Sequence, residues 1–272
     1  MTGVAKPYAE VIGDPIAHSK SPLIHGHWLD ECSIAAEYRA HHVIASDLAR
    51  YFAERCEDEA WRGCNITIPH KVAALGSVTN EAEIRAGVGA INTVIRDEHR
   101  KLIGTNTDIG GFYAPIADRD WTGASAVVIG AGGAARAVLF ALAQLKFGEV
   151  IVLNRSPLKA MGLLSAFRLK GRALPLETPL PDADLIVNAS PLGMTGQPEF
   201  APDFAAVSEN ATVYDLVYTP IETPLLATAR QAGLETVDGL AMLIAQAALA
   251  FELFFGVSPP SDDAVLRRLL LA

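Results

Sequence analysis

Short apolar runs alternate with helical stretches along most of the 272-residue chain, with turns between them. This alternation is typical of α/β proteins whose strands are mostly parallel. The predicted strands are Tyr8–Ile12, Glu37–His41, Cys64–Ile68, Ala90–Arg96, Lys101–Gly104, Ser125–Ile129, Glu149–Leu153, Leu185–Asn188, Thr212–Asp215 and Glu235–Val237. The predicted helices are Pro22–Ser33, Asp47–Asp58, Gly110–Asp118, Ala134–Lys146, Pro157–Phe167, Pro224–Ala232 and Leu240–Phe255.

The last of these helices, Leu240–Phe255, is apolar on nearly every side. Such a pattern predicts that the helix is buried between other elements. Gln246 and Glu252 interrupt it, and it is too short and too polar for a membrane span. The residues before the first strand do not have the pattern of a secretory signal, so we expect a cytoplasmic protein without membrane association.

The composition narrows the choice of partners. Lys and Arg number 22 against 31 Asp and Glu, and the resulting net charge of −9 argues against nucleic-acid binding. Hydrophobic residues make up 50% of the chain and charged residues 19%, which excludes disorder. The three cysteines are too few for a disulfide scaffold and lack zinc-type spacing.

A glycine-rich turn follows the predicted strand Ser125–Ile129 and precedes a helix. Gly130 and Gly132 are spaced as in the dinucleotide-binding fingerprint, with Ala135 at the third glycine position. Glycines let the backbone approach a pyrophosphate, and the helix N-terminus supplies N–H groups. The cofactor-binding residues predicted here are Gly130, Ala131, Gly132, Gly133 and Ala134. The alternative is a tight turn without a ligand.

The next predicted strand ends in Asn154, Arg155 and Ser156, where an NAD-preferring site usually has an acidic residue. Arg155, with Lys159 one turn further on, instead forms a cationic fork that suits a 2′-phosphate. The sequence therefore predicts a preference for NADP over NAD. The alternative is that Arg155 and Lys159 are ordinary surface charges without a role in cofactor binding. In the later loop Asn188–Met194, Asn188 and Ser190 are candidate cofactor contacts or simply turn residues.

Polar residues interrupt four predicted elements before the glycine turn, and burying them is costly unless they are paired or bind a ligand. The four stretches are Gly13–Pro22 with Ser19 and Ser21, Cys64–Lys71, Ala90–Thr93 with Asn92, and Gly104–Asp108. Each alone is more often structural, but together they indicate a polyhydroxylated ligand. Ser21 and Pro22 suit an N-cap and a first helical residue, and the two serines also suit a carboxylate.

The stretch Cys64–Lys71 carries the most information. With the two-residue period of a strand, Asn65 and Thr67 share one face, opposite Cys64, Ile66 and Ile68. Pro69 ends the strand, so that Lys71 lies at a strand-to-helix junction.

Taken together, these motifs resemble the shikimate/quinate dehydrogenase family. The matching stretches are Gly13–Pro22, Asn65–Lys71, Gly89–Thr93, Gly104–Asp108, Gly130–Ala135, Asn154–Ser156, Asn188–Met194 and Asp238–Gln246, which span almost the whole chain in one order. The resemblance implies two α/β domains with the active site in their cleft, and a C-terminal helix that returns to the first domain. The implied domains are a substrate-binding and catalytic domain of residues 1–107 plus 240–272, and a Rossmann-type NADP-binding domain of residues 108–239.

The resemblance also implies residue roles. Lys71 and Asp108 are the expected catalytic pair. The expected substrate contacts are Ser19, Ser21 and Tyr218 for the carboxylate, and Asn65, Thr67, Asn92, Asp108 and Gln246 for the ring hydroxyls. Gly239 and Met242 would flank the nicotinamide, and Gln246, four residues after Met242, lies on the same helix face. Ile109 stands where the family often has glycine, so the crossover backbone is expected to differ there.

The implied reaction is the reversible reduction of 3-dehydroshikimate to shikimate with NADPH, in aromatic amino acid biosynthesis. Lys71 is our hypothesis for the acid–base group, with Asp108 orienting it. A quinate or aminoshikimate dehydrogenase is one alternative, and a non-catalytic NADP-binding regulator is another, although Lys71 and Asp108 are both present. A metal enzyme is disfavoured because His25/His27 and His41/His42 lack carboxylates at ligand spacing. The family includes monomers and homodimers, and either is expected.

Overall fold

The computed structural model describes residues 5–261 and 263–271 of the chain. The chain divides into two compact units, Met1–Thr107 with Gln246–Ala272, and Asp108–Ala245. The sequence analysis placed the second boundary at 239/240, whereas the second unit extends to Ala245. The predicted first domain also takes in residues 1–4, 262 and 272, which lie outside the described residues.

The first unit is built on a five-stranded sheet in the order β2-β1-β3-β4-β5. Its strands are β1 (Tyr8–Gly13), β2 (Glu37–His42), β3 (Trp61–Ile66), β4 (Thr93–Arg96) and β5 (Leu102–Thr105). β1 pairs in parallel with β2 and β3, while β3, β4 and β5 pair antiparallel. A short turn closed by the Asp97 N–H and the Lys101 carbonyl joins β4 to β5, and so short a connection permits only an antiparallel hairpin.

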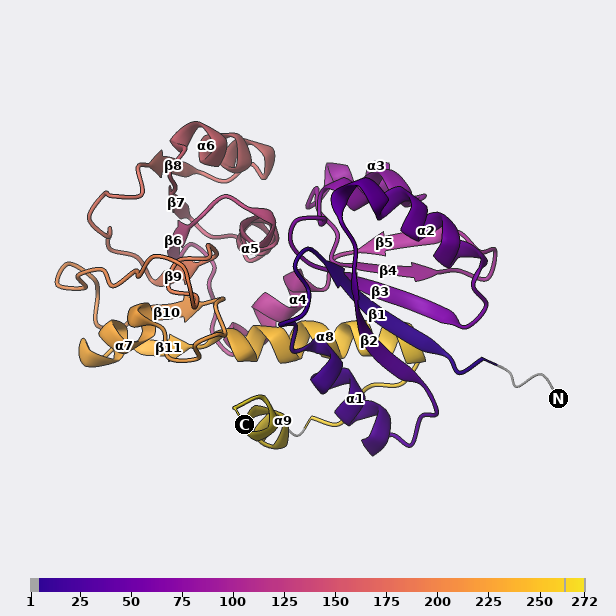
Figure 1. Cartoon of the computed structure of the whole chain (residues 1–272). Coiled ribbons are helices and arrows are strands. Elements are labelled where there is room, and N and C mark those ends of the chain that lie inside the picture. Colours follow the sequence, from indigo (N-terminus) through magenta and orange to yellow (C-terminus); the bar gives the residue numbers. More distant parts are fainter. Residues whose placement is uncertain (1–4, 262, 272) are drawn as a thin grey trace. The chain divides into compact units, whose positions relative to one another are not determined.

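Helical segments cover both faces of this sheet (Figure 1). One face packs against α2 (Leu48–Glu57), the 3-10 segment η2 (Ala73–Ser77) and α3 (Glu81–Ala86), around the buried Trp61 and Phe52. The other face packs against α1 (Ser21–Glu31) and the later part of α8 (Gly239–Phe255). α9 (Asp263–Leu271) packs beside α1.

The second unit is a six-stranded, fully parallel sheet in the order β11-β10-β9-β6-β7-β8. Its strands are β6 (Ser125–Ile129), β7 (Glu149–Leu153), β8 (Gly171–Leu174), β9 (Leu185–Asn188), β10 (Thr212–Asp215) and β11 (Glu235–Val237). This is the order of the doubly wound dinucleotide-binding fold, whose strand order reverses between β6 and β9. The predicted α/β class and its mostly parallel strands are confirmed.

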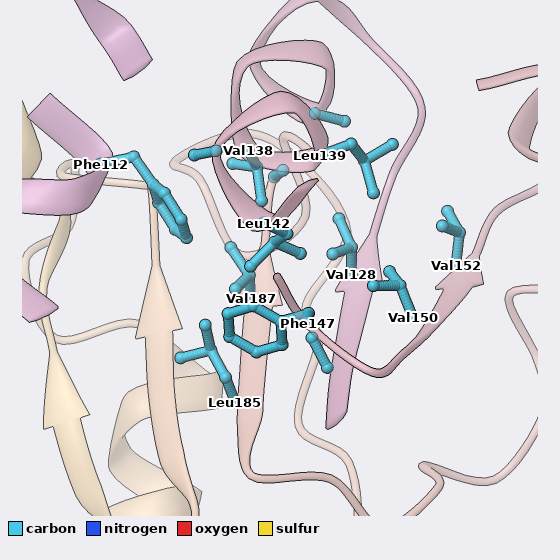
Figure 2. Close-up of a cluster of buried hydrophobic side chains, with 14 of the residues drawn as sticks. Phe112, Val128, Val138, Leu139, Leu142, Phe147, Val150, Val152, Leu185 and Val187 are labelled. Atoms are coloured by element: carbon cyan, nitrogen blue, oxygen red, sulfur yellow. The ribbon is translucent and has the colours of Figure 1, made fainter. Parts of the chain in front are cut away.

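Alternate side chains of each central strand enter opposite cores of the second unit. Val128, Val150 and Val187 point toward α4 (Asp108–Tyr113), α5 (Gly133–Gln144) and α6 (Pro157–Ala166), as Figure 2 shows for the α5 side. Val127 and Ile129 point to the opposite core, which includes α7 (Pro224–Gln231). Coverage on both faces explains why these strands are continuous apolar runs in the sequence.

Several elements differ from the prediction. β8, α3 and α9 were not predicted, nor were the 3-10 segments η1 (Ala45–Asp47) and η2. The predicted helix Gly110–Asp118 is divided into α4 and the 3-10 segment η3 (Ala114–Ile116). β3 ends at Ile66 rather than Ile68, because a hydrogen bond from the His70 N–H to the Thr67 carbonyl turns the chain away from the sheet. Ile68 is therefore 65% exposed and does not share the buried face of Cys64.

Two expectations about helices were wrong. Ser21 is not an N-cap: Lys20 occupies that position, and Ser21 is the first residue of α1. α8 is not buried on all sides, since Leu249 and Leu253 are each exposed by more than two fifths. Among the described residues, no helix is long and apolar enough to cross a membrane.

Candidate functional site

A row of amide and hydroxyl side chains crosses three neighbouring strands of the first unit. In the sheet register, Asn65 of β3 lies opposite Thr93 of β4, and Thr93 lies opposite Thr105 of β5. Asn92 precedes β4, and Thr107 follows β5. All of these strand ends meet at one edge of the sheet, so residues far apart in sequence form one polar cluster.

Asn92 is the centre of this cluster. Its Oδ1 accepts hydrogen bonds from the Thr107 N–H at 2.7 Å and from the Thr93 hydroxyl at 3.0 Å. Its Nδ2 donates to the Thr107 hydroxyl at 2.9 Å and to Gln246 Oε1 at 3.4 Å. The structure therefore brings together two of the predicted substrate contacts, Asn92 and Gln246, although 154 positions separate them in the sequence.

Asn65 extends the cluster toward β2. Its Nδ2 donates to Thr93 Oγ1 at 3.0 Å, and its Oδ1 accepts from the Tyr38 hydroxyl at 2.6 Å. The Ser21 hydroxyl also hydrogen-bonds the Tyr38 phenol. Burial holds the pKa of Tyr38 well above its ordinary value, so this phenol keeps its proton. Sequence reasoning missed Tyr38, because a tyrosine in a strand carries no signal that distinguishes it from a packing residue.

Ser19 and Ser21 lie close to each other at the start of α1. The Ser21 N–H donates to Ser19 Oγ at 3.3 Å. Ser21 is buried and Ser19 is half-buried, so the two hydroxyls line the same helix start. Thr67 lies just after β3, packed so closely to β1 that a Cβ at Gly13 would be 2.5 Å from its methyl group.

Lys71 and Asp108 follow strand ends of the first unit's sheet. Lys71 is half-buried, and its carbonyl accepts from the Ile91 N–H at 2.8 Å, which ties it to the chain just before Asn92. Its neighbour His70 is buried with Nε2 2.6 Å from the Val43 carbonyl, which anchors this turn. Asp108 is the buried first residue of α4 and directly follows Thr107. Ile109, the departure from the family pattern, packs against the core of the second unit.

In the second unit, the glycine turn and the loop after β9 lie side by side at the point where the strand order reverses. The Ala189 N–H donates to the Ile129 carbonyl at 2.9 Å. Gly130 has a φ of +106°, and a Cβ there would approach the Ala189 carbonyl to 3.0 Å, so this position requires glycine. A Cβ at Gly132 would meet nothing within 4 Å, which leaves open space before the first turn of α5. α5 has no side-chain cap.

The predicted cationic group, Arg155 and Lys159, follows β7. Asn154 folds back so that its Nδ2 donates to the Ser156 carbonyl at 2.9 Å. Arg155, Ser156 and Lys159 are exposed at the start of α6. The carboxyl ends of β6 and β7 are joined by a hydrogen bond from the Gly130 N–H to the Leu153 carbonyl at 2.8 Å. The glycine turn and the cationic group therefore lie at adjacent strand ends of the same sheet.

Asn188 is buried at the end of β9, where its side chain is held by hydrogen bonds within the protein. Its side chain is fully buried, with Nδ2 donating to Asp215 and to the Leu192 carbonyl and Oδ1 accepting from Ser190. Burial raises the pKa of Asp215 to about 6, although Thr223, Val217 and Asn188 all donate to this carboxylate. Ser190 remains half-buried beside the glycine turn.

Tyr218 and Gly239 follow the next two strands, β10 and β11. Burial raises the pKa of Tyr218, so its hydroxyl stays protonated. A Cβ at Gly239 would be 2.4 Å from the Val217 carbonyl, so only glycine allows α8 to begin this close to the loop after β10. Met242 is buried within the core of the second unit one turn further along α8.

Among the described residues, no group of three His, Cys, Asp or Glu side chains is placed to hold a metal ion. His25 is fully buried, stacks on Tyr38 with ring centroids 3.9 Å apart, and has its pKa lowered to about 3 by burial. His42 does lie 2.8 Å from Asp14, a proximity that the sequence spacing did not reveal.

A Rossmann-type sheet with a glycine turn at its switch point, joined to a second α/β unit that gathers amides and hydroxyls, defines the class: a two-unit, nucleotide-dependent α/β oxidoreductase. The chain is 58% identical over 269 residues to a shikimate dehydrogenase (NADP(+)) of Sphingopyxis alaskensis, covering 98% of both chains. This chain belongs to the shikimate dehydrogenase family. Three family models match it: the shikimate dehydrogenase substrate binding domain over residues 11–94, shikimate/quinate 5-dehydrogenase over 114–192, and the shikimate 5′-dehydrogenase C-terminal domain over 239–270.

Solved structures share the whole fold. The shikimate 5-dehydrogenase of Thermus thermophilus in complex with NADP(H) and shikimate matches with a TM-score of 0.83 and 35% identity, covering 97% of this chain and 98% of that one. The ligand-free 5-ketofructose reductase of Gluconobacter sp. strain CHM43 matches with a TM-score of 0.87 and 30% identity over 99% of both chains. Because the second protein is named for a different substrate, the fold alone does not decide the substrate.

Proposed function

We propose that this protein catalyses the NADP-dependent, reversible reduction of 3-dehydroshikimate to shikimate in aromatic amino acid biosynthesis. The observation that carries this proposal is the amide and hydroxyl cluster of the first unit, in which Asn65, Asn92 and Gln246 meet through hydrogen bonds. Such groups both donate and accept, which suits a ring that carries several hydroxyls. The 58% identical relative carries the same activity in its name.

The substrate residues divide by chemistry. Ser19, Ser21 and Tyr218 bind the carboxylate through hydroxyl donors. Asn65, Thr67, Asn92 and Gln246 bind the ring hydroxyls, and Asp108 joins them. The closeness of Ser19 to Ser21, and the bonds that link Asn65, Asn92 and Gln246, support these two groups of contacts.

The second unit fits NADP. Gly130 and Gly132 leave the backbone of the turn open, and the uncapped first turn of α5 offers N–H donors to a pyrophosphate. Gly130, Ala131, Gly132, Gly133, Ala134 and Ser190 form this part of the site. Asn154, Arg155, Ser156 and Lys159 bind the adenosine 2′-phosphate, and Gly239 and Met242 lie at the nicotinamide. When bound, NADPH supplies the hydride for the ring carbonyl.

Lys71 is the general acid and base of the proposed reaction. When the carbonyl is reduced, charge develops on its oxygen, and a proton delivered from Lys71 Nζ neutralises it; in the reverse direction the amine accepts the proton of the ring hydroxyl. Asp108 is the second member of the catalytic pair and keeps the lysine oriented. The hydrogen bond between Lys71 and Ile91 places the lysine backbone next to the chain that carries Asn92.

A steady-state assay tests the proposed function. Oxidation of shikimate with NADP is expected to exceed that of quinate, and the NAD-linked reactions, by roughly tenfold or more in kcat/KM. Quinate carries an additional hydroxyl that must be desolvated, and NAD lacks the phosphate that Arg155 and Lys159 would bind. Reduction of 5-ketofructose is measured in parallel, since a reductase of that sugar shares the fold. Turnover of quinate or 5-ketofructose above that of shikimate would overturn the proposed substrate.

Arg155→Ala is expected to lower kcat/KM for NADP roughly 10- to 100-fold while leaving kcat/KM for NAD nearly unchanged. A charge-assisted hydrogen bond contributes about 1.5–3 kcal/mol, and only NADP carries the phosphate that makes one. Steady-state kinetics with each cofactor at saturating shikimate give the ratio.

Lys170→Ala is the matched control for this variant. Lys170 is also an exposed cation of the second unit, but it precedes β8 and so lies at the opposite, amino end of the parallel sheet. It should leave the ratio of NADP to NAD unchanged. The same unchanged ratio in Arg155→Ala would refute the assignment of Arg155 to the 2′-phosphate.

A further inference from the structure

We propose that Thr93 is a positioning residue that fixes which way the side-chain amides of Asn65 and Asn92 face the substrate. Thr93 is fully buried, so it does not itself contact a ligand, whereas Asn65 and Asn92 keep some exposed surface. Its single hydroxyl lies between the two amides, 3.0 Å from Asn65 Nδ2 and 3.0 Å from Asn92 Oδ1. This inference rests on the proposed function.

The orientation of Asn92 is set by the backbone. The Thr107 N–H is a permanent donor, and it lies 2.7 Å from Asn92 Oδ1, so this atom must be the oxygen of the amide. The Nδ2 of Asn92 is thereby directed to the Thr107 hydroxyl and Gln246 Oε1.

Thr93 passes this orientation on to Asn65. A hydroxyl has one proton to donate, and Thr93 directs it to Asn92 Oδ1, so only its lone pairs face Asn65. The atom of Asn65 nearest to them must then be Nδ2, which leaves Oδ1 to accept from Tyr38 at 2.6 Å. Tyr38 keeps its proton because burial raises its pKa, and it can therefore fill the donor role.

Thr93 thus makes the array of donors and acceptors around the substrate ring unique. Without its hydroxyl, the remaining partner of Asn65 Nδ2 in this direction is the Asn92 carbonyl at 3.4 Å, a long contact. The amide of Asn65 is then held only by Tyr38 and by this long contact, so it more readily rotates and offers the wrong group to a ring hydroxyl. Loss of orientation affects substrate binding more than the proton transfer at Lys71.

Thr93→Val tests the proposal, because valine has nearly the same shape and lacks the hydroxyl. KM for shikimate is expected to rise roughly tenfold or more, the cost of leaving a buried donor without a good acceptor, while kcat and KM for NADP change little. Thr93→Ser keeps the hydroxyl and should restore KM to near the wild-type value. If the valine variant does not fold, Thr93→Ala, which adds no group, is measured in its place with the same expected rise in KM.

Thr79→Val is the control for a purely structural effect. Thr79 also belongs to the first unit and also donates a part-buried hydroxyl hydrogen bond, to the Leu102 carbonyl at 3.1 Å, outside the cluster. It should lower Tm without changing KM for shikimate. An unchanged KM for shikimate in a folded Thr93→Val or Thr93→Ala variant would overturn the positioning role of Thr93 but not the proposed function. A raised KM that Thr93→Ser shares with Thr93→Val would overturn the positioning role in the same way. A wild-type protein that oxidises no shikimate would overturn both the proposed function and this inference.

Discussion

Lys71→Met is expected to lower kcat for shikimate oxidation by about 10²–10⁴-fold while KM for shikimate changes little. A positioned acid–base group contributes about that factor, and methionine matches the length of lysine without offering a proton. Asn65 and Asn92, the proposed substrate contacts, are held by hydrogen bonds to Thr93, Tyr38 and Thr107, which the substitution leaves in place. Steady-state kinetics and direct measurement of shikimate binding give the two quantities separately.

Two further variants separate proton transfer from charge. Lys71→Arg retains the positive charge, but a guanidinium does not release its proton near neutral pH, so kcat should fall here as well. Lys101→Met removes an exposed lysine of the same unit and should leave turnover unchanged. Near-normal kcat in Lys71→Met, with the protein folded and shikimate bound, would reject the proposed role of Lys71.

The largest effect on stability is expected at Glu10, a carboxylate with no exposed surface in β1. Its oxygens accept hydrogen bonds from Arg55 at 2.8 and 3.3 Å, from Arg39 at 3.1 Å and from the Tyr51 hydroxyl at 2.9 Å. Arg55 is itself only 14% exposed, whereas Arg39 is 48% exposed. Ion pairs and hydrogen bonds of Glu10 therefore connect β1, β2 and α2 at a buried position where apolar packing would be expected.

Glu10→Gln is expected to destabilise the first unit by on the order of 3 kcal/mol. Glutamine offers one acceptor oxygen where the carboxylate has two, so its NH₂ group faces donors and Arg55 loses its buried counter-ion. Urea unfolding is followed by tryptophan fluorescence in a Trp121→Phe background, where the buried Trp28 and Trp61 report on this unit. Hydrogen exchange of the backbone amides of β1, β2 and β3 then shows whether the loss of stability lies in this part of the sheet.

The same network predicts how stability depends on pH. Burial by itself acts to raise the pKa of Glu10, but the hydrogen bonds and charge of Arg55, with those of Tyr51 and Arg39, outweigh it and leave the pKa below its ordinary value. A lowered pKa means that the ionised carboxylate stabilises the native state above the ordinary glutamate pKa. That contribution is lost as pH falls below it toward the native-state value. The free energy of unfolding of Glu10→Gln should therefore depend less on pH in this acidic range than that of the wild type.

Glu37→Gln provides the comparison. Glu37 is paired with Lys6 at 3.7 Å on neighbouring β2, and both side chains are 51% exposed. Exposed pairs contribute at most about 1 kcal/mol, so this variant should unfold close to the wild type. Equal stabilities of the Glu10 and Glu37 variants would show that the buried network does not hold the first unit together.

Local signals in the sequence were sufficient for most of the second unit. The predicted bounds of β6, β7, β9, β10 and β11 are those of the structure. Most residues of β6, β7, β9 and β10 are buried, and in β6, β7 and β9 this burial appears as a run of apolar residues. β11 is instead a short Glu-Thr-Val edge strand that is exposed or half-buried. β8 was not predicted because it is an exposed edge strand, and its sequence Gly-Arg-Ala-Leu contains no apolar run. In the first unit, the extension of β3 to Ile68 was wrong because a turn at Thr67 ends the strand, which alternation alone does not reveal.

The sequence by itself singled out the candidate site residues: the glycine turn at Gly130, the cation at Arg155, and the polar residues Asn65 and Asn92 within predicted apolar strands. Each of these rests on a few neighbouring positions, where backbone geometry and residue type act locally. Only the tertiary structure decided that Asn188 is buried in its own turn, and that Tyr38 and Thr93 both hydrogen-bond Asn65. It alone revealed that Glu10 is buried among arginines 29 and 45 positions away. Hydrogen bonds and charges act between residues that are close in space. The fold sets those distances for residues that are far apart in the sequence, where no local pattern along the chain indicates them.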